Sequence, residues 1–445
     1  MMIENEKCLK NNICIFIIMV IMIVYITGCK KNNEANIRFP AIPDDYTVSK
    51  ELYMSTGDVI FAFIENEEID YAKIQSEIYT KNAEKVKKEC EEIIGKENDP
   101  EKYVAIQNII AITDIYLSNY KQAYERFNDT ISFVEENVEK DKSKVLTVLY
   151  NNAGTATYYL QEISTVEELL EKASALCEEP YMGLVIAANQ IIREKVNASV
   201  KQIGKAMMRA DKLISLESKI TDSINLVTYS AVRCWSAGYI VMGESEKAIK
   251  LLEEYIPLIP NSAEYNLIRT SLIGMKGNCY KELKEYEKAI EDIQNAIYFA
   301  EKTVNPNFKG LAFEYHKIAI CYENLENWDK AIDYFELANP GYVQAMPIEK
   351  GALYYDEGCA YFRSGEYDIA KRYFLLSYVN LQEIIGKSDS DVVNELISDV
   401  KDNLSVIYLL DKTITAPFYE WLEQELAQIE EEVEEEETEK EETKS

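Results

Sequence analysis

Histidine is nearly absent from this chain of 445 residues, which contains His316 alone. One histidine cannot build a multi-histidine metal site, and no HExxH, GxSxG, GxxxxGKS, GxxxxGKT or GxGxxG string occurs. The 78 acidic residues make chance carboxylate pairs frequent, so their spacing does not indicate glycosidase chemistry. We therefore expect no enzymatic activity, no metal and no cofactor.

Turn-forming and basic residues are also scarce. Only 16 Gly and 10 Pro interrupt the chain, which favours long helices joined by brief turns. Lys and Arg number 47 against 78 Asp and Glu, giving a net charge of −31. Because nucleic-acid phosphates are bound by Lys and Arg, we predict an all-α protein that does not bind nucleic acid.

The cysteines are few, widely scattered and never arranged as CxxC. In a chain of this size that spacing argues against both a disulfide framework and a zinc site. Small buried packing residues are the better interpretation for the six that follow residue 29, namely Cys90, Cys177, Cys234, Cys279, Cys321 and Cys359.

The apolar stretch near the start of the chain is too short to span a bilayer as a helix. It runs from Ile13 to Ile26, about 14 residues against roughly 20 needed, and follows a short charged start. This pattern is typical of a signal-peptide core. An uncleaved membrane anchor is the alternative, and both interpretations place the rest of the chain outside the cytoplasm.

The string Ile26-Thr27-Gly28-Cys29 closes the apolar stretch and resembles the lipobox of bacterial lipoproteins. The resemblance implies cleavage after Gly28 and acylation of Cys29, with palmitate-like chains holding the protein on the membrane. We therefore expect residues 1–28 to be a lipoprotein signal peptide. The mature protein is expected at the extracytoplasmic face of the cell membrane, lipid-anchored.

A repeat of about forty residues organises the middle of the chain. Four alanines lie 41, 42 and 39 residues apart, and a tyrosine precedes each of them by nine positions. The alanines are Ala248, Ala289, Ala331 and Ala370, and the tyrosines are Tyr239, Tyr280, Tyr322 and Tyr361.

These positions resemble the tetratricopeptide repeat, a helix, turn, helix unit of about 34 residues. In the second copy Gly277-Asn278-Cys279-Tyr280 stands where the family has Gly-Asn-x-Tyr, and Ala289, Ile293 and Ala296 match the second helix. A unit of 41 residues is nearly two helical turns longer than the family's unit. An addition of about whole turns keeps the core-facing side chains on the same side of each helix. The resemblance implies an α-solenoid of stacked helical hairpins.

The composition along the chain gives the expected boundaries. Asp99-Pro100 marks a helix start, and the last 16 residues contain ten Glu. We expect a tether at 29–48, an N-terminal helical region at 49–99, a solenoid of about seven hairpins at 100–412 that is clearest at 229–380, a capping helix at 413–429, and an acidic disordered tail or fraying helix at 430–445.

In the tetratricopeptide family, a concave groove binds peptides or partner helices. The groove is lined by side chains of the first helix of each hairpin that point away from the packing interface. The resemblance places Arg233, Asn278, Lys281, His316, Tyr355, Phe362 and Arg363 there, together with Ile240 and Glu323. Arg and Lys would receive a peptide carboxylate and the aromatic rings would give apolar contact. Ordinary solvated helix positions remain an equally weighted alternative.

The function expected from these features is a lipid-anchored scaffold that binds a protein or peptide partner in its groove. The alternative is a solute- or glycan-binding lipoprotein associated with a transporter. It is disfavoured because Trp235, Trp328 and Trp421 fall on packing stripes and not on exposed platforms. A cytoplasmic peptide-pheromone sensor would require that the start of the chain is not a signal peptide.

Overall fold

The computed structural model describes residues 39–43, 46–160, 163–194, 200–220, 225–342, 347–382, 384 and 391–442. The predicted signal peptide, Cys29 and residues 30–38 of the predicted tether lie outside these residues. The chain divides into two compact units, Lys31–Tyr315 and His316–Ser445, called here the N-terminal and C-terminal units. No helix among the described residues is both long and apolar enough to cross a membrane.

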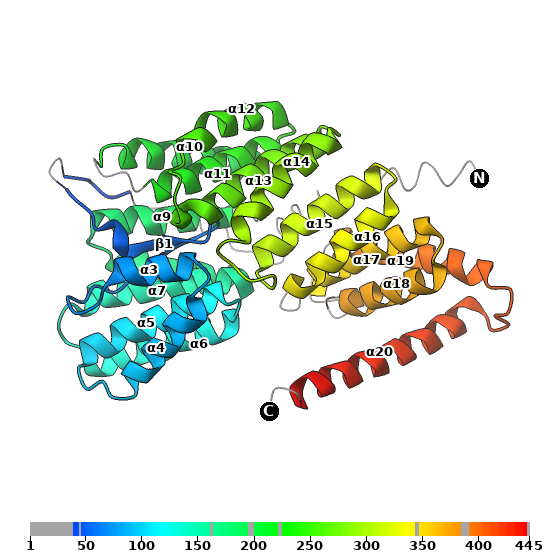
Figure 1. Ribbon diagram of the computed structural model, residues 1–445, viewed down its shortest axis with the longest axis horizontal. Helices are drawn as coiled ribbons and strands as arrows, with labels where there is room; N and C mark the ends of the chain where they lie inside the picture. Colours follow the sequence, from blue (N-terminus) through cyan, green and yellow to red (C-terminus); the bar gives the residue numbers. More distant parts are fainter. Residues whose placement is uncertain are drawn as a thin grey trace. The chain divides into compact units, whose positions relative to one another are not determined.

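The N-terminal unit consists of helices that pack as successive hairpins around one short β-hairpin (Figure 1). Its small elements are η1 (Lys50–Leu52), β1 (Tyr53–Ser55), β2 (Ile60–Ala62), η2 (Ile256–Leu258) and η3 (Ala263–Tyr265). Its helices are α3 (Tyr71–Tyr79), α4 (Ala83–Ile94), α5 (Pro100–Tyr116), α6 (Tyr120–Asn137), α7 (Lys142–Leu160), α8 (Ile163–Leu176), α9 (Pro180–Glu194), α10 (Val200–Glu217), α11 (Leu226–Val241), α12 (Ser245–Tyr255), α13 (Asn266–Glu282) and α14 (Tyr286–Ala300).

The C-terminal unit continues the helical pattern. The unit boundary falls inside α15 (Lys309–Asn324). The elements that follow are α16 (Trp328–Ala338), η4 (Asn339–Tyr342), α17 (Pro347–Ser364), α18 (Tyr367–Gln382), α19 (Asp391–Leu410) and α20 (Phe418–Glu442). This helical architecture confirms the predicted all-α class and the tetratricopeptide-like α-solenoid.

The last helix continues beyond residue 429, where the sequence places its end. α20 extends to Glu442, so the acidic segment is helical where the structure describes it. Glutamate is a good helix former, Ile429 is buried, and Glu432 pairs with Arg372 of α18. Residues 430–442 thus continue α20 in the structure.

The signature alanines lie at close helix contacts, as predicted. All four are fully buried. Gly277 of α13 shows how close the helices approach, because a Cβ there would lie 2.5 Å from Cγ1 of Ile293 in α14. Small residues at these crossings let the helix axes come within packing distance.

Each signature alanine follows a left-handed turn residue by five positions. The φ angles are 72° at Gly243, 62° at Lys284, 57° at Glu326 and 91° at Gly365. Lys81 and Ser118 repeat this left-handed conformation, each with a φ of 65°. In each turn the next amide donates to a carbonyl five residues earlier, closing the helix end, as from Asn119 to Asp114 at 2.8 Å. The structural repeat therefore begins at the α3/α4 hairpin, upstream of the recognisable sequence signature.

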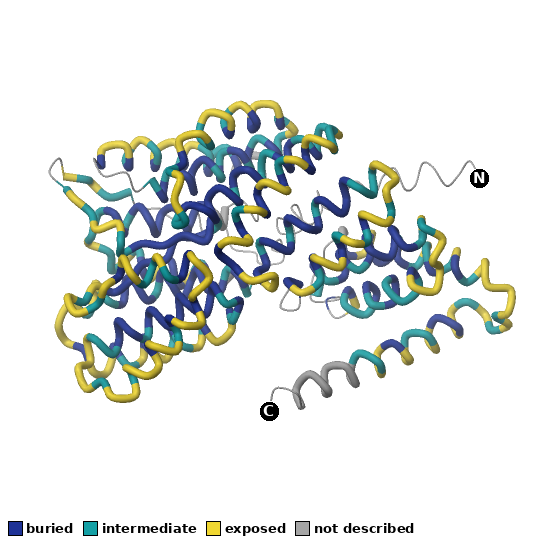
Figure 2. Tube along the Cα trace, in the orientation of Figure 1, coloured by how far each residue is buried: buried dark blue, intermediate teal, exposed yellow. Residues whose placement is uncertain are grey.

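First and second helices of the hairpins differ in burial (Figure 2). In α5 every residue from Val104 to Tyr116 except Gln107 is buried. In α6 only a single stripe of side chains, including Ala123 and Phe127, is buried. A helix that is apolar nearly all round must be covered on two sides. α4 and α6 both pack against α5, and Asn108 and Tyr116 of α5 also donate hydrogen bonds to the carbonyls of Ala62 and Ser55 in the β-hairpin.

The β-hairpin lies within residues 49–99, the region that the sequence predicts as the N-terminal helical region. β1 and β2 pair antiparallel, with Met54 opposite Phe61. The segment Val59–Phe63 is rich in β-branched and aromatic residues and follows Gly57, whose φ is 85°. Those properties favour an extended conformation, and helices occupy only the remainder of the region as α3 and α4.

Candidate binding site around the buried hairpin

The β-hairpin is enclosed by the helices of the N-terminal unit. β2 packs against α7 and α9, and the chain around η1 packs against α3. Met54, Ile60 and Phe61 have no exposed surface. A two-stranded sheet of this length is not stable alone, so its conformation depends on the helices that surround it.

Four asparagines hold the outer edge of β2, and we call them the asparagine clamp: Asn108 of α5, Asn151 and Asn152 of α7, and Asn189 of α9.

The amide of Ile60 donates to Oδ1 of Asn189 at 2.9 Å, and its carbonyl accepts from Nδ2 of Asn189 at 2.8 Å and of Asn151 at 3.2 Å. The amide of Ala62 donates to Oδ1 of Asn152 at 3.0 Å. The carbonyl of Ala62 accepts from Nδ2 of Asn152 at 2.7 Å and of Asn108 at 3.1 Å.

The clamp residues also bond to one another in one continuous line from α9 to α5. Nδ2 of Asn189 donates to Oδ1 of Asn151 at 2.9 Å, Asn151 donates to Asn152 at 3.1 Å, and Asn152 donates to Asn108 at 2.8 Å. All four side chains are buried. A buried amide that loses its partners costs roughly 1–3 kcal/mol, so the network fixes both the helices and the strand.

Side chains also satisfy the outer edge of β1. Nε2 of Gln75 donates to the carbonyl of Tyr53 at 2.8 Å. The amide of Ser55 donates to the Tyr79 hydroxyl at 3.0 Å, and the Tyr116 hydroxyl donates to the Ser55 carbonyl at 3.0 Å. Burial raises the pKa of Tyr79 to about 12, so this hydroxyl stays protonated at neutral pH.

The turn of the hairpin is held by a charge and by close packing. Nη2 of Arg233 in α11 lies 2.5 Å from Oδ1 of Asp58. A Cβ at Gly57 would lie 2.3 Å from the carbonyl oxygen of Leu267, so the turn fits only glycine without displacement. The surrounding side chains thus contact the extended main chain of the hairpin and the carboxylate of Asp58.

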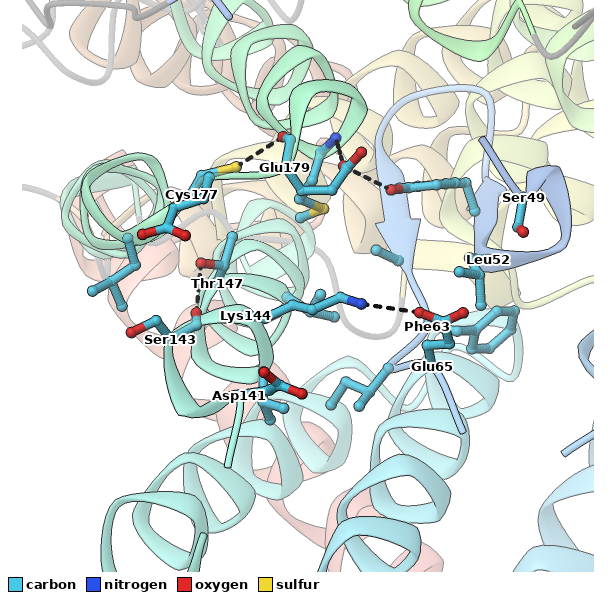
Figure 3. Close-up of a pocket in the computed structure, with 18 of the residues that line it drawn as sticks. Ser49, Leu52, Phe63, Glu65, Asp141, Ser143, Lys144, Thr147, Cys177 and Glu179 are labelled. Carbon is cyan, nitrogen blue, oxygen red and sulfur yellow. Dashed lines mark hydrogen bonds and ion pairs between the residues drawn. The ribbon is translucent and has the colours of Figure 1, made fainter. Parts of the chain in front are cut away.

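A cavity of about 590 Å³ begins where β2 ends (Figure 3). Phe63 and Leu52 line one side, and Lys144 of α7 reaches Glu65 across it at 2.9 Å. The Tyr53 hydroxyl donates to Oε2 of Glu179 at 3.3 Å at the edge of the cavity. Burial raises the pKa of Glu179 above its usual range. The lining is therefore mixed, with an apolar wall and paired charges.

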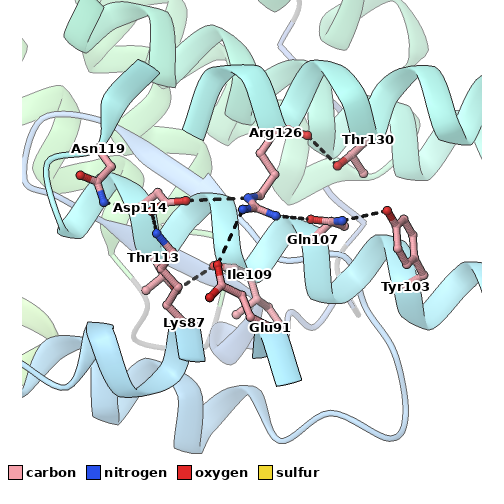
Figure 4. Close-up of polar contacts among 10 residues, drawn as sticks. All are labelled: Lys87, Glu91, Tyr103, Gln107, Ile109, Thr113, Asp114, Asn119, Arg126 and Thr130. Atoms are coloured by element: carbon pink, nitrogen blue, oxygen red, sulfur yellow. Dashed lines mark hydrogen bonds and ion pairs between the residues drawn. The ribbon is translucent and has the colours of Figure 1, made fainter. Parts of the chain in front are cut away.

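A second polar cluster lies between α4, α5 and α6 (Figure 4). Asp114 is fully buried, and its carboxylate lies 2.7 Å from Nζ of Lys87 and 3.8 Å from Nε of Arg126. Asn119 donates to the same carboxylate at 3.1 Å. Asp114 stands nine residues before Ala123, the position held by tyrosine in the four clear repeats. In this repeat an ion pair therefore takes the place of the signature tyrosine side chain.

The structure brings one predicted groove residue of the N-terminal unit to the hairpin. That residue is Arg233, whose partner is the carboxylate of Asp58. Ile240 is buried, Lys281 is buried and pairs with Glu282 at 2.8 Å, and Asn278 is 1% exposed with both amide atoms unpartnered. These three do not contribute to an open surface.

Two of the predicted groove residues in the C-terminal unit are packing residues. Nδ1 of His316 lies 2.7 Å from the Tyr342 hydroxyl and Nε2 lies 3.1 Å from Oδ2 of Asp356, and the ring is buried. Tyr355 is also buried, with its ring centroid 5.9 Å from that of Phe374.

The other predicted groove residues of this unit lie nearer to solvent. Phe362 is half-buried with its ring 5.2 Å from that of Tyr367, and Arg363 is exposed with its guanidinium 6.0 Å from the Trp328 ring. Glu323 is half-buried, and burial raises its pKa to about 8.

The clamp asparagines were not among the residues predicted from the sequence. Each interrupts an apolar helical stretch, as in Ile106-Gln107-Asn108-Ile109 and in Ala187-Ala188-Asn189. A buried polar residue requires a partner, so this pattern was the available signal. No group of three His, Cys, Asp or Glu among the described residues is placed to hold a metal ion.

Comparisons with known proteins agree with this architecture. Tetratricopeptide repeat models match residues 271–303 and 315–338. Response regulator aspartate phosphatase E of Bacillus subtilis is 28% identical over 133 residues, which are 29% of this chain and 32% of that protein. The chain thus aligns with about a third of that relative's length.

Among solved structures, a Rap protein complexed with Competence and Sporulation Factor superposes with a TM-score of 0.50 at 15% identity, covering 82% of this chain and 96% of that one. The apo form of RapI superposes with a TM-score of 0.41 at 15% identity, covering 68% and 86%. These likenesses concern the fold. The chain contains tetratricopeptide repeats within an α-solenoid similar to that of Rap proteins.

Proposed function

We propose that the protein is a lipid-anchored extracytoplasmic scaffold that binds a protein or peptide partner as an extended segment. The observation that carries the proposal is the asparagine clamp, which bonds the amide and carbonyl groups of both Ile60 and Ala62. Side-chain amides that donate and accept at alternate residues recognise main chain in an extended conformation.

The chemistry of the site supports binding. Its contacts to the strand are hydrogen bonds and one ion pair, between Arg233 and Asp58. The Rap structure holding Competence and Sporulation Factor has a similar fold, and the proposal extends ligand binding to this chain. The proposal assigns no reaction, because the relative named as a phosphatase aligns with only 29% of the chain.

The location part of the proposal rests on the sequence. The apolar stretch ending in Ile26-Thr27-Gly28-Cys29 supports export and acylation at Cys29. With a net charge of −31, the body of the protein has little attraction for anionic lipid headgroups. Under this proposal the lipid alone holds the scaffold at the membrane surface.

A random peptide library displayed on phage tests the binding part. The soluble portion from Glu34 onward is expected to enrich peptides whose affinity falls about thirtyfold in Asn152→Ala, which removes two bonds worth roughly 1 kcal/mol each. Asn137→Ala, at an exposed position on α6, is the control that should leave affinity unchanged. Circular dichroism establishes that both variants are folded. Enriched peptides that bind the two variants equally would place the binding surface elsewhere.

A further inference from the structure

We propose that the hairpin Tyr53–Phe63 is a resident ligand of the asparagine clamp, and that a peptide of the same chemistry displaces it. The inference rests on the proposed function and names both its ligand class and its regulation. The clamp bonds are made to main-chain atoms of Ile60 and Ala62. Any extended segment with free amide and carbonyl groups at alternate positions supplies the same atoms.

The side-chain contacts define which segments fit. Asp58 supplies the carboxylate for Arg233, and the five residues that follow, Val59 to Phe63, are all buried. The matching partner is therefore an extended peptide with an acidic residue followed by about five apolar residues. The cavity of about 590 Å³ beyond Phe63 leaves room for an occupant that continues past the end of β2.

The hairpin has its own cross-strand pairing but is too short to be stable without the helices that hold it. Each strand has three residues, and the outer edges of both are satisfied by side chains of α3, α5, α7 and α9. The segments that flank the hairpin are neither strand nor α-helix. Each contains an exposed residue, Thr47 before the hairpin and Glu67 after it. Displacement would therefore break contacts to the helices and leave the helix hairpins intact.

The clamp needs an occupant. Without β2, each asparagine keeps its bonds to its neighbours and loses the bonds to main chain that it makes within the core of the intact protein. The tethered hairpin competes at an effective concentration of the order of millimolar, so a free peptide binds the intact protein weakly. Release of the hairpin raises the affinity for the free peptide.

The experiment cuts the chain and leaves the site unchanged. Protease recognition sequences inserted after Thr47 and Glu67, both exposed, convert residues 48–67 into a non-covalent fragment. The probe is a fluorescein-labelled synthetic peptide of residues 48–67. We expect the cut protein to exchange its fragment for the probe and to bind it at least about tenfold more tightly than the uncut protein does.

Backbone N-methylation identifies the clamp as the place of binding. Methylation at Ile60 or Ala62 removes an amide that donates to an asparagine, so the affinity of the probe should fall about tenfold. Methylation at the exposed Glu65 is the control and should have little effect.

Each of the following results would overturn the inference. The cut protein could keep its fragment without exchange, it could unfold by circular dichroism once cut, or Ile60 and Glu65 methylation could weaken the probe equally. The first two would make the hairpin a permanent part of the core. Library peptides that bind cut and uncut protein alike would leave a peptide-binding scaffold, but they would reject the hairpin as a competitor and place the peptide site away from the clamp, which β2 fills in the uncut protein. A folded, cut protein that binds neither probe nor library peptides would reject both.

Discussion

Asp114 illustrates how much a single position can change within a repeat. It occupies the site of a signature tyrosine, and its carboxylate has no exposed surface. A buried carboxylate is tolerated only when its charge is paired and hydrogen-bonded. Lys87, Arg126 and Asn119 supply those partners from α4, α6 and the turn between α5 and α6. The pair therefore ties the first two hairpins together.

Removing one partner of this pair should destabilise the N-terminal unit. Lys87→Met leaves the buried carboxylate of Asp114 without its shortest contact, and we expect a loss of about 3 kcal/mol in the free energy of unfolding. Lys88→Met, at the exposed neighbouring position, should stay within about 0.5 kcal/mol. Urea denaturation measures both, and equal midpoints would contradict the role assigned to the pair.

Glu357 should make the C-terminal unit sensitive to pH. Burial raises the pKa of this carboxyl from 4.5 to about 7, while Tyr373 and Asn339 lower it in part. The folded state therefore holds a proton that the unfolded state releases above pH 4.5. The contribution of this group to the free energy of unfolding is therefore greatest below pH 4.5. Between pH 4.5 and about pH 7 it falls by up to about 1.4 kcal/mol per pH unit.

Glu357→Gln tests this pH dependence because the amide cannot ionise. We expect the variant to lose most of the decline in stability between pH 4.5 and pH 7 and to be the more stable protein at pH 8. Thermal unfolding of both proteins at several pH values measures the difference. Parallel curves for the two proteins would show that Glu357 does not titrate in this range.

At the scale of elements, the sequence predicts helices well and the hairpin not at all. The signature alanines identify the helix crossings because only a small residue fits where two helices touch, as at Ala289 and Ala331. β1 and β2 have three residues each, too few for a two-residue period to emerge. Their partners are asparagines more than 40 residues away, and no local pattern connects them.

The fit at the crossings makes a prediction for α16. Ala331→Leu forces extra methyl groups into a contact with no free surface and should cost about 1–3 kcal/mol of stability. The adjacent exposed substitution Lys330→Ala should change stability by less than about 0.5 kcal/mol. Differential scanning calorimetry compares the two variants. Equal melting temperatures would mean that the repeat register is assigned incorrectly.

At the scale of the whole molecule, the fold and the proposed membrane location rest on different parts of the chain. The helices, the clamp and the hairpin belong to residues that the structure describes, whereas the proposed export and anchoring rest on the sequence of residues 1–29. Periodicity predicted the solenoid because every repeat obeys the same packing rule. The occupied clamp could not be predicted, since it joins the hairpin to α5, α7 and α9 through contacts specific to this chain.

The proposed anchor can be tested directly by replacing single cysteines with alanine. We expect Cys29→Ala to abolish incorporation of a fatty-acid analogue, because this residue would carry the acyl chains after cleavage at Gly28. Cys14→Ala is the matched control, since Cys14 lies in the segment that cleavage removes and its loss should leave labelling intact. Metabolic labelling followed by fractionation measures both lipid content and membrane association. We also expect Cys29→Ala to block cleavage after Gly28, because the cysteine belongs to the lipobox-like string Ile26-Thr27-Gly28-Cys29. Full labelling of that variant would show that Cys29 is not the acylated residue.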